Sequence, residues 1–337
     1  MRFEFYSDKI ANLPKLSVDG TVDDAIHFSH WHGNQTPPEV KADTSTEIAL
    51  NLVASPEREK LTRGIELVTN NHFDTDGVLS VWTVLNAERA LSLREELIAA
   101  AEAGDFSELS SVDGVRASIV IQASDSPIDK SGSPLAEHLT GTAVSDEARA
   151  YELVLPHVEQ VLTHNSDYEF LWREPWSRIE RALESFARGA SEIVEDTDAR
   201  FSLITLAPEV FGTIGFEPAL HAAPFTAISH HARGELFVIV TPLAGGLSYR
   251  IDYPYYSWAE TVVRPAIPRR DFSALMNELN ELEQNPSAAW KLDTSELASA
   301  AKFIDQSGFL GASKLEPQVV AARLRNFLLG SIAATAH

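Results

Sequence analysis

One short stretch, residues 67–85 (LVTNNHFDTDGVLSVWTVL), ends an apolar run with a histidine and two aspartates, His72, Asp74 and Asp76. In an extended chain these three side chains lie on one side, because alternate residues do. Two carboxylates and one imidazole suit a divalent cation such as Mn²⁺, Mg²⁺ or Zn²⁺. Aspartate also caps helix N-termini, so the residue types alone leave metal binding and capping of the following helix as equal alternatives.

Two strand–loop–helix units must position these side chains. The runs 25–30 (AIHFSH) and 65–71 (IELVTNN) have the pattern of strands, and the runs 44–54 and 78–91 have the pattern of helices. This alternation predicts an α/β domain with a mostly parallel sheet flanked by helices. Loops that follow parallel strands meet at one edge of the sheet, so both loops are expected to line one crevice.

The rest of the chain changes character along its length. Residues 92–104 and 147–195 are rich in helix formers, whereas residues 110–146 have the Gly, Ser, Pro and Asp content of an exposed loop or lid. A strand is expected at 200–208, and a β-rich part with two helical segments follows. We therefore predict an α/β domain over residues 1–230 and a smaller α+β domain over residues 231–337.

The composition limits the class of protein. The 337 residues include no cysteine, so a metal would be held by His, Asp and Glu. Forty-nine acidic and 27 basic residues give a net charge of −22, which disfavours long duplex nucleic acid and leaves a small anionic substrate as an alternative. No apolar run approaches the roughly 20 residues that span a membrane. A cytoplasmic location is expected, and a homodimer is compatible with the sequence.

The stretch NNHFDTDGVLS (70–80) resembles motif I of the DHH phosphoesterase superfamily, in which a strand is followed by His-x-Asp-x-Asp-Gly and a helix. In that family the histidine and both aspartates bind a two-metal cluster, usually of manganese. The resemblance implies a DHH-like fold with His72, Asp74 and Asp76 as metal ligands and Asp76 in the catalytic centre. The chain is also similar to an uncharacterised bacterial family with SHW-x-GN and NNHFD-x-DG signatures, which implies no activity.

Residues 26–53 resemble motif III of the same superfamily, where a strand runs into Asp-His-His-x-x-Asn and a Ser/Thr-rich turn opens a helix. The resemblance implies that His30 orients the phosphate or protonates the leaving group and that Asn34 contacts substrate. Ser29 stands where the family has Asp and Trp31 where it has the second His, which leaves His32 to supply an imidazole. The motif also precedes motif I, which implies a permuted domain and leaves a one-metal site as an alternative.

Three more aspartates are candidates for this site. Asp105 (EAGDF) and Asp19 (SVDG) could each supply a remaining ligand or be turn residues, and Asp105 is preferred because it closes a helix beside the first motif. Asp43, just before TSTE (44–47), is a candidate helix cap or ligand, with capping favoured.

The C-terminal part is expected to bind substrate, as the domain that follows DHH domains does. Residues 249–271 combine tyrosines and a tryptophan with arginines, a mixture that suits phosphate and base recognition. Arg250 and Arg264 are the candidate substrate contacts, and a packed sheet edge with solvated arginines is the alternative. The run that ends in His230 and His231 is strand-like and is a weaker candidate for the Asp-His-His motif.

The favoured function is a metal-dependent hydrolase of a small phosphoester or related anionic substrate, with manganese as the expected ion. One alternative is a non-catalytic ligand-binding protein on a degenerate DHH-like scaffold, for which Ser29 and Trp31 are the evidence. A second alternative is a metal-dependent hydrolase of a non-phosphate bond, because a bound cation activates water for either reaction.

Overall fold

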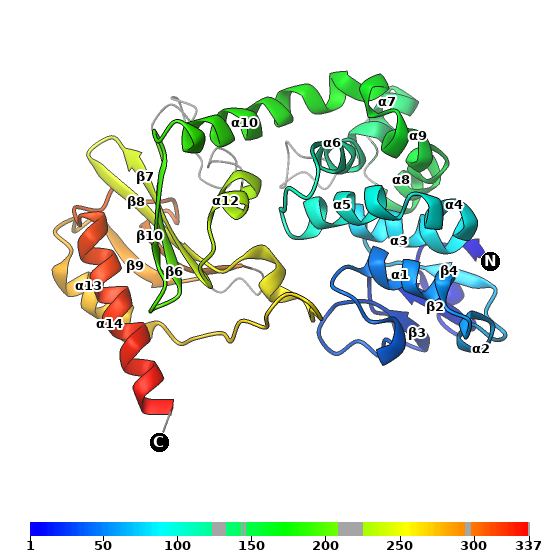
Figure 1. The fold of residues 1–337 in the computed structure, drawn as a ribbon, viewed down its shortest axis with the longest axis horizontal. Coiled ribbons are helices and arrows are strands. Elements are labelled where there is room, and N and C mark those ends of the chain that lie inside the picture. Colours follow the sequence, from blue (N-terminus) through cyan, green and yellow to red (C-terminus); the bar gives the residue numbers. More distant parts are fainter. Residues whose placement is uncertain (123–132, 143, 145, 208–224, 294–297, 336–337) are drawn as a thin grey trace. The chain divides into compact units, whose positions relative to one another are not determined.

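A computed structural model describes residues 1–122, 133–142, 144, 146–207, 225–293 and 298–335 of the chain (Figure 1). It divides into two compact units. The first contains residues 1–177 together with the short segment 258–266, and the second contains residues 178–257 and 267–337.

The first unit contains a small sheet and most of the helices. Its strands are β1 (Arg2–Phe3), β2 (Lys15–Val18), β3 (Ala25–Phe28) and β4 (Leu67–Thr69). Its helices are α1 (Ser45–Ala54), α2 (Arg58–Leu61), α3 (Thr75–Leu85), α4 (Ala87–Ser92), α5 (Arg94–Asp105), α6 (Val112–Ile121), α7 (Pro134–Thr140), α8 (Glu147–Val154), α9 (Val158–Thr163) and the start of α10 (Glu169–Ala187). Short 3-10 turns lie at Asp8–Ile10, Pro38–Val40, Leu155–His157 and Asn165–Tyr168.

The predicted parallel sheet of the first unit is confirmed. Its strand order is β1-β4-β2-β3, and every pair is parallel. Helix α3 packs against β1, β2 and β4 and also contacts α1 and α5 (Figure 1). Because β3 and β4 flank β2 in the same direction, the three loops after these strands leave the same edge of the sheet.

Strand β2 (KLSV) alternates polar and apolar residues, a pattern that predicts a strand with one face in solvent. Its four residues are all buried, yet two of them are Lys15 and Ser17. The Lys15 ammonium donates hydrogen bonds to the carbonyls of Ala11 (2.6 Å) and Asp24 (3.1 Å), and the Ser17 hydroxyl donates to the Gly20 carbonyl. Local carbonyls thus satisfy polar side chains that the sequence alone would place on a surface.

The prediction of an exposed loop over residues 110–146 is wrong for much of its described part. Residues 112–121 form helix α6, which packs against α5, and residues 134–140 form α7. Ser111 caps α6 by accepting a hydrogen bond from the Gly114 amide at 2.9 Å, so the serine and glycine that suggested a loop belong to a helix start. Residues 123–132, 143 and 145 lie outside the described residues.

The second unit is a mixed six-stranded sheet with helices on both faces. Its strands are β5 (Glu192–Asp196), β6 (Phe201–Thr205), β7 (Leu236–Leu243), β8 (Gly246–Asp252), β9 (Ala288–Leu292) and β10 (Ser299–Asp305), in the order β5-β6-β7-β8-β10-β9. Only β6 and β7 are parallel. Its helices are the end of α10, α12 (Phe225–His231), α13 (Ser273–Leu282) and α14 (Pro317–Thr335), and a 3-10 turn lies at Tyr255–Trp258.

Alternate residues of the second sheet fill two cores. Leu203 and Val238 point toward α13 and α14, whereas Ile204 and Ile239 point toward α10 and α12. The strand-like reading of the residues before Ser229 is therefore wrong, because they form α12 and pack on the second face.

The unit division differs from the expected boundary at residue 230. Strand β6 pairs in parallel with β7 from Phe201 to Thr205, so the chain before residue 230 already contributes strands to the second sheet. Hydrogen bonding between these strands, which are far apart in the sequence, decides the boundary. A composition change cannot show it.

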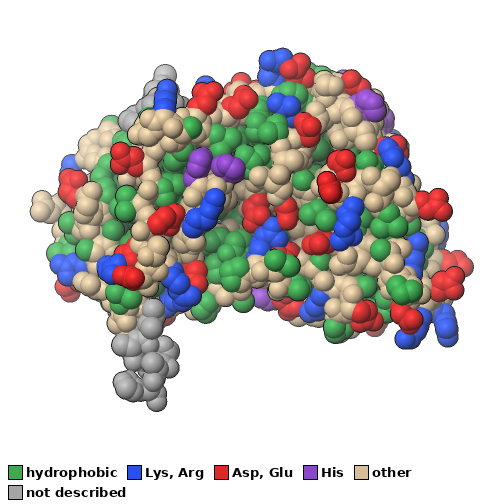
Figure 2. Space-filling view, viewed as in Figure 1, with side chains coloured by type: hydrophobic (Ala, Val, Ile, Leu, Met, Phe, Trp, Pro, Cys, Tyr) green, Lys and Arg blue, Asp and Glu red, His purple; other side chains and the backbone are tan. Residues whose placement is uncertain are grey.

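The surface carries charged side chains of both signs. Acidic and basic side chains are interspersed over the face that Figure 2 shows. Among the described residues, no helix is long and apolar enough to cross a membrane.

Candidate metal centre

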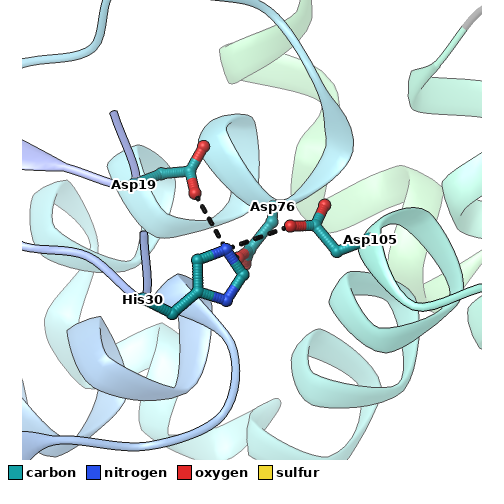
Figure 3. Close-up of side chains that lie close together, drawn as sticks. All are labelled: Asp19, His30, Asp76 and Asp105. Carbon is teal, nitrogen blue, oxygen red and sulfur yellow. Dashed lines mark ion pairs between the residues drawn. The ribbon is translucent and has the colours of Figure 1, made fainter. Parts of the chain in front are cut away.

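Four side chains meet beyond the carboxyl ends of β2 and β3. Asp19 directly follows β2, His30 lies two residues after β3, Asp76 is in the first turn of α3, and Asp105 is the last residue of α5. Figure 3 shows the three carboxylates around one edge of the His30 ring. The His30 Nε2 atom lies 3.2 Å from Asp105, 3.6 Å from Asp19 and 3.7 Å from Asp76. We call these four residues the inner group.

A second group shares Asp19. The His72 Nε2 atom lies 2.8 Å from Asp19 Oδ2 and 3.0 Å from Asp74 Oδ2. Ligand atoms of Asp19, His72 and Asp74 all lie within 4.8 Å of one another, as do those of the inner group. We call His72 and Asp74, with the shared Asp19, the outer group. Asp19 follows the central strand, and this position explains why it reaches both groups.

The two groups differ in their exposure to solvent. The side chains of Asp19, His30 and Asp76 are fully buried, and Asp105 is nearly so. His72 is 25% exposed and Asp74 is 22% exposed. The outer group is therefore the part of the centre that is accessible to solvent.

Helix starts and backbone groups hold the carboxylates in place. The two oxygens of Asp76 accept hydrogen bonds from the amides of Ser45 and Thr46, both at 2.7 Å, in the first turn of α1. Asp74 Oδ1 caps α3 through the Gly77 amide at 2.7 Å. Capping and metal binding, which were predicted as alternatives, are therefore compatible for Asp74. Its Oδ1 caps the helix, and its Oδ2 faces His72 and can bind a metal ion.

Each histidine is oriented by a bond to its other ring nitrogen. His30 Nδ1 donates to the Asp43 carbonyl at 2.7 Å, and His72 Nδ1 lies 3.0 Å from Asn71 Oδ1. Both arrangements point Nε2 into the centre. Histidines that bind metals are held in the same way, with one ring nitrogen hydrogen-bonded and the other turned toward the ion.

Asp19 itself adopts a strained backbone conformation. Its φ of 64° lies in the left-handed region, which residues other than glycine rarely occupy. Its amide donates to the Phe28 carbonyl at 3.0 Å, which ties the end of β2 to β3. Such strain is typical of functional sites, where the surrounding structure holds a side chain in a required position.

Close packing fixes the loops around the centre. Asn70, fully buried, accepts from the Gly20 amide at 3.1 Å and donates to the Tyr151 hydroxyl at 2.9 Å. A Cβ atom on Gly20 would lie 2.4 Å from the Asn70 side chain, and one on Gly77 would lie 2.3 Å from it. Only glycine fits at either position.

The proximity of these groups shifts their protonation. Burial alone would lower the pKa of His30, but Asp105, Asp76 and Asp19 raise it to about 10. Burial would likewise lower the pKa of His72, and Asp74 and Asp19 raise it to about 12. Both imidazoles are therefore protonated near neutral pH when no cation is present, and they balance part of the carboxylate charge.

The carboxyl groups respond in different directions. Burial and the nearby Asp19 charge raise the pKa of Asp76 to about 6, although the His30 charge acts in the opposite direction. Burial and the charges of Asp74 and Asp76 raise the pKa of Asp105. Burial would raise the pKa of Asp19, but His72 and His30 outweigh it and lower the pKa.

Several polar atoms of the centre are buried without a hydrogen-bond partner. Among the described residues, both oxygens of Asp19, Nε2 of His30 and Oδ2 of Asp105 are buried without a hydrogen bond of ordinary geometry. Neighbouring ligand atoms lie about 3.0 to 3.4 Å apart around a cation whose ligands are at about 2.1 Å. The separations around His30 and His72 are close to this range. This buried Asp/His cluster can bind a metal ion.

The other residues expected at the site lie elsewhere or have other partners. His32 is not part of the cluster, because its side chain is 72% exposed and its nearest charge is Glu260 at 3.8 Å. Asn34 donates to the Trp31 carbonyl and to Glu260, both at 2.8 Å, and so shapes its own loop. Arg250 lies on β8 in the second unit and pairs with Asp252 at 2.7 Å.

Arg264 and Asp43 form a structural contact. Arg264 pairs with Asp43 at 2.7 Å and with Glu102 and Glu108, each at 2.6 Å, so its guanidinium is fully engaged by protein carboxylates. Asp43 is not the expected helix cap, because Thr44 caps α1 by accepting from the Glu47 amide. The Asp43 carboxylate instead accepts the amides of Val263 and Arg264 at 2.8 and 3.0 Å.

The comparisons with known proteins give a family and no activity. Residues 1–330 match a family described as "Family of unknown function (DUF6687)". The chain belongs to this family. No curated protein matches the sequence. The chemistry of a DUF6687 protein must therefore be inferred from the centre itself.

Proposed function

We propose that this protein is a metal-dependent hydrolase of a small phosphoester or related anionic substrate, acting through two adjacent cations. The observation that carries the proposal is the position of Asp19, whose carboxylate belongs to both the inner and the outer group. A carboxylate shared in this way can bridge two ions at the short separation used in two-metal hydrolysis.

The inner and outer groups would have different roles in this reaction. Divalent cations at such a site supply a nucleophilic hydroxide near neutral pH and stabilise negative charge on phosphoryl oxygens. The buried inner group would hold one ion, and the partly exposed outer group, with His72 and Asp74, would be the side that substrate approaches. Buried carboxylates and imidazoles suit Mn²⁺, with Mg²⁺ or Zn²⁺ as alternatives.

The role proposed for His30 differs from the one that the family resemblance implied. Its Nδ1 is occupied by the Asp43 carbonyl, its Nε2 faces three carboxylates, and its side chain is fully buried. It cannot reach a leaving group at the surface, so we assign it to the inner ion as a ligand. Asp76 is assigned in the same way.

The arrangement supports a permuted DHH-like domain. The sequence order of the two motifs is reversed, but β3 and β4 are parallel neighbours of β2, so the loops after them still converge. The serine in place of an aspartate at position 29 does not leave the site short of a carboxylate, because Asp19 supplies one from the central strand. Ser29 accepts the Trp31 amide at 3.0 Å and shapes that turn.

Metal analysis tests the proposal directly. Protein purified without chelator and dialysed against Mn²⁺ should hold two ions per chain, measured by elemental analysis and by titration of free Mn²⁺. Asp19→Asn should weaken the binding of both ions, because the side chain that both groups share loses its charge. Asp23→Asn is the matched control, since Asp23 lies exposed in the following loop and should leave both ions in place.

Activity is tested on the same samples with a panel of small phosphoesters. Hydrolysis that requires Mn²⁺ and is lost in Asp19→Asn supports the proposal. Two bound ions without hydrolysis of any member of a broad panel would contradict the phosphoesterase function and favour a non-phosphate bond. Failure to bind Mn²⁺ at micromolar concentration would favour the non-catalytic ligand-binding alternative.

A further inference from the structure

Residues 258–266, which we call the strap, belong to the first unit although the chain on both sides of them belongs to the second. Beyond Trp258 the strap has no helix or strand, and it is fixed by side chains of the metal-site unit. The Glu260 carboxylate accepts the Gly33 amide at 3.1 Å and pairs with Lys41 at 3.1 Å. A segment without regular structure is thus held at several points.

We propose that the strap is a positioning device for the inner metal site, with Arg264 as its main positioning residue. The inference rests on the proposed two-ion function. It assigns to the strap a selective role: Arg264 holds His30 and Asp105 in place, and it does not act on His72 and Asp74.

The path from the strap to His30 runs through Asp43. Three consecutive amides of the strap, at residues 262–264, donate to the Asp43 carboxylate, and the Arg264 guanidinium donates to it at 2.7 Å. The carbonyl of the same Asp43 accepts His30 Nδ1 at 2.7 Å. Fixing Asp43 therefore fixes the ring orientation that aims His30 Nε2 at the inner group.

The strap contacts His30 in two further places. The Glu260 amide donates to the His30 carbonyl at 2.7 Å, and the Trp258 ring meets the imidazole edge-on at a centroid distance of 4.9 Å. Backbone, ring face and Nδ1 of His30 are thus all held by the strap or by Asp43, which leaves Nε2 as the atom that faces the centre.

The path to Asp105 runs through its neighbours in the sequence. Arg264 donates to Glu102 and to Glu108, which lie on either side of Asp105, and its guanidinium lies 4.9 Å from the Phe106 ring centroid. One arginine therefore fixes the end of α5, and with it the direction of the Asp105 carboxylate. An arginine side chain suits this role because its planar fork presents five donors in fixed directions, whereas a lysine ammonium is a compact point charge.

The outer ligands are fixed mainly by groups outside the strap, which reaches them through the ring contact of Trp258 with Trp31 at a centroid distance of 5.6 Å and not through Arg264. Asp74 is held by the Gly77 amide, and His72 by Asn71 at Nδ1 and by the Trp31 ring at a centroid distance of 5.2 Å. If the strap only stabilised the fold, loss of its contacts would weaken the binding of both ions. If it positions the inner ligands, that loss would weaken the binding of the inner ion alone.

Double mutants separate these roles. In a His72→Gln background, where only the inner ion should remain, Arg264→Ala should lower Mn²⁺ affinity roughly 10- to 100-fold, the range found for outer-shell partners of metal ligands. In a His30→Gln background, where only the outer ion should remain, the same change should alter affinity by less than about 3-fold. Arg264→Lys should give an intermediate loss.

Val263→Ala is the matched control, because the Val263 side chain is 86% exposed and the change keeps its amide. It should leave both affinities unchanged. Melting curves in chelator show whether each variant is folded, and Arg264→Lys serves if Arg264→Ala does not fold. Equal losses in both backgrounds, or no loss in either, would overturn the inference while leaving the two-ion function intact.

If the wild-type protein binds no Mn²⁺, the proposed function fails and the strap is tested without metal. The proton on His30 Nδ1, protected by the Asp43 carbonyl, should give a slowly exchanging imidazole NMR resonance. Loss of that protection in Arg264→Ala, with Val263→Ala unchanged, supports the positioning role, and its persistence refutes it.

Discussion

At the scale of single residues, Asp74 has two separable functions. Its Oδ1 caps α3, and its Oδ2 faces His72. Asparagine keeps the capping oxygen and loses the charge, whereas alanine loses both.

Asp74→Asn should therefore weaken Mn²⁺ binding at the outer group while leaving the melting temperature in chelator almost unchanged. Asp74→Ala should weaken binding as much and also lower the free energy of unfolding by about 1 kcal/mol. Paired melting curves with and without Mn²⁺ measure both effects. Equal stability of the two variants in chelator would show that the cap contributes nothing.

The charge balance of the centre is also a residue-scale property. Four aspartates and two histidines lie together, and the raised pKa values of His30 and His72 keep both imidazoles protonated without a cation. Unpaired buried charges cost far more than paired ones. The protonated histidines thus balance part of the carboxylate charge, and a cation that binds at the centre would displace their Nε2 protons.

At the scale of elements, Glu283 joins the end of α13 to the turn before α14. Its carboxylate accepts the Ser313 hydroxyl at 2.5 Å and the Lys314 amide at 3.0 Å, and it also accepts amides of its own turn. Partial burial would raise its pKa, but these hydrogen bonds outweigh burial and lower the pKa below the ordinary 4.5. The charged form is therefore the one that stabilises the fold.

A carboxylate whose pKa is lower in the folded than in the unfolded protein stabilises the fold at pH values above its ordinary pKa. This contribution is lost as the pH falls through the pKa of the folded state. Glu283→Gln should lower the free energy of unfolding by about 1–2 kcal/mol at pH 7, and the difference from wild type should shrink below about pH 4.5. Denaturant titrations at several pH values measure it. The exposed Glu281→Gln is the control and should stay within about 0.5 kcal/mol of wild type; a pH-independent difference for Glu283→Gln would contradict the argument.

At the scale of the whole molecule, neither unit is a single stretch of chain. The strap returns to the first unit after 80 residues of the second, from 178 to 257. Strands β5 and β6 precede the expected boundary at residue 230, but β6 pairs with β7 beyond it, and β5 pairs with β6.

A fragment of residues 1–230 should therefore fold poorly. It retains Phe201, Leu203 and Ile204 but lacks β7, so these buried side chains would be exposed. We expect aggregation in size-exclusion chromatography and strong binding of an apolar dye. A fragment of residues 1–177, which keeps the first unit except for the strap, should show less of both. A monomeric, cooperatively unfolding 1–230 fragment would contradict the unit division.

The sequence by itself determined the local features of this protein. Periodicity predicted β3, β4, α1 and α3, because apolar residues there face a core at the spacing of one strand or helix. The order of these elements predicted the parallel sheet. The types and spacing of His72, Asp74 and Asp76 predicted one metal site at its edge. The structure divides them, with His72 and Asp74 in the outer group and Asp76 in the inner group, and this Asp/His cluster can bind a metal ion.

The tertiary structure alone decided which residues complete that cluster and which do not. Asp19 could not be distinguished from a turn residue, because β2 buries polar side chains in the core, and only the position of β2 between β3 and β4 places the Asp19 carboxylate in both groups. Arg264 and Asn34 looked free to bind substrate, yet their partners lie up to 226 residues away in the sequence. Local sequence patterns cannot predict such contacts, because they form only when folding brings distant parts of the chain together.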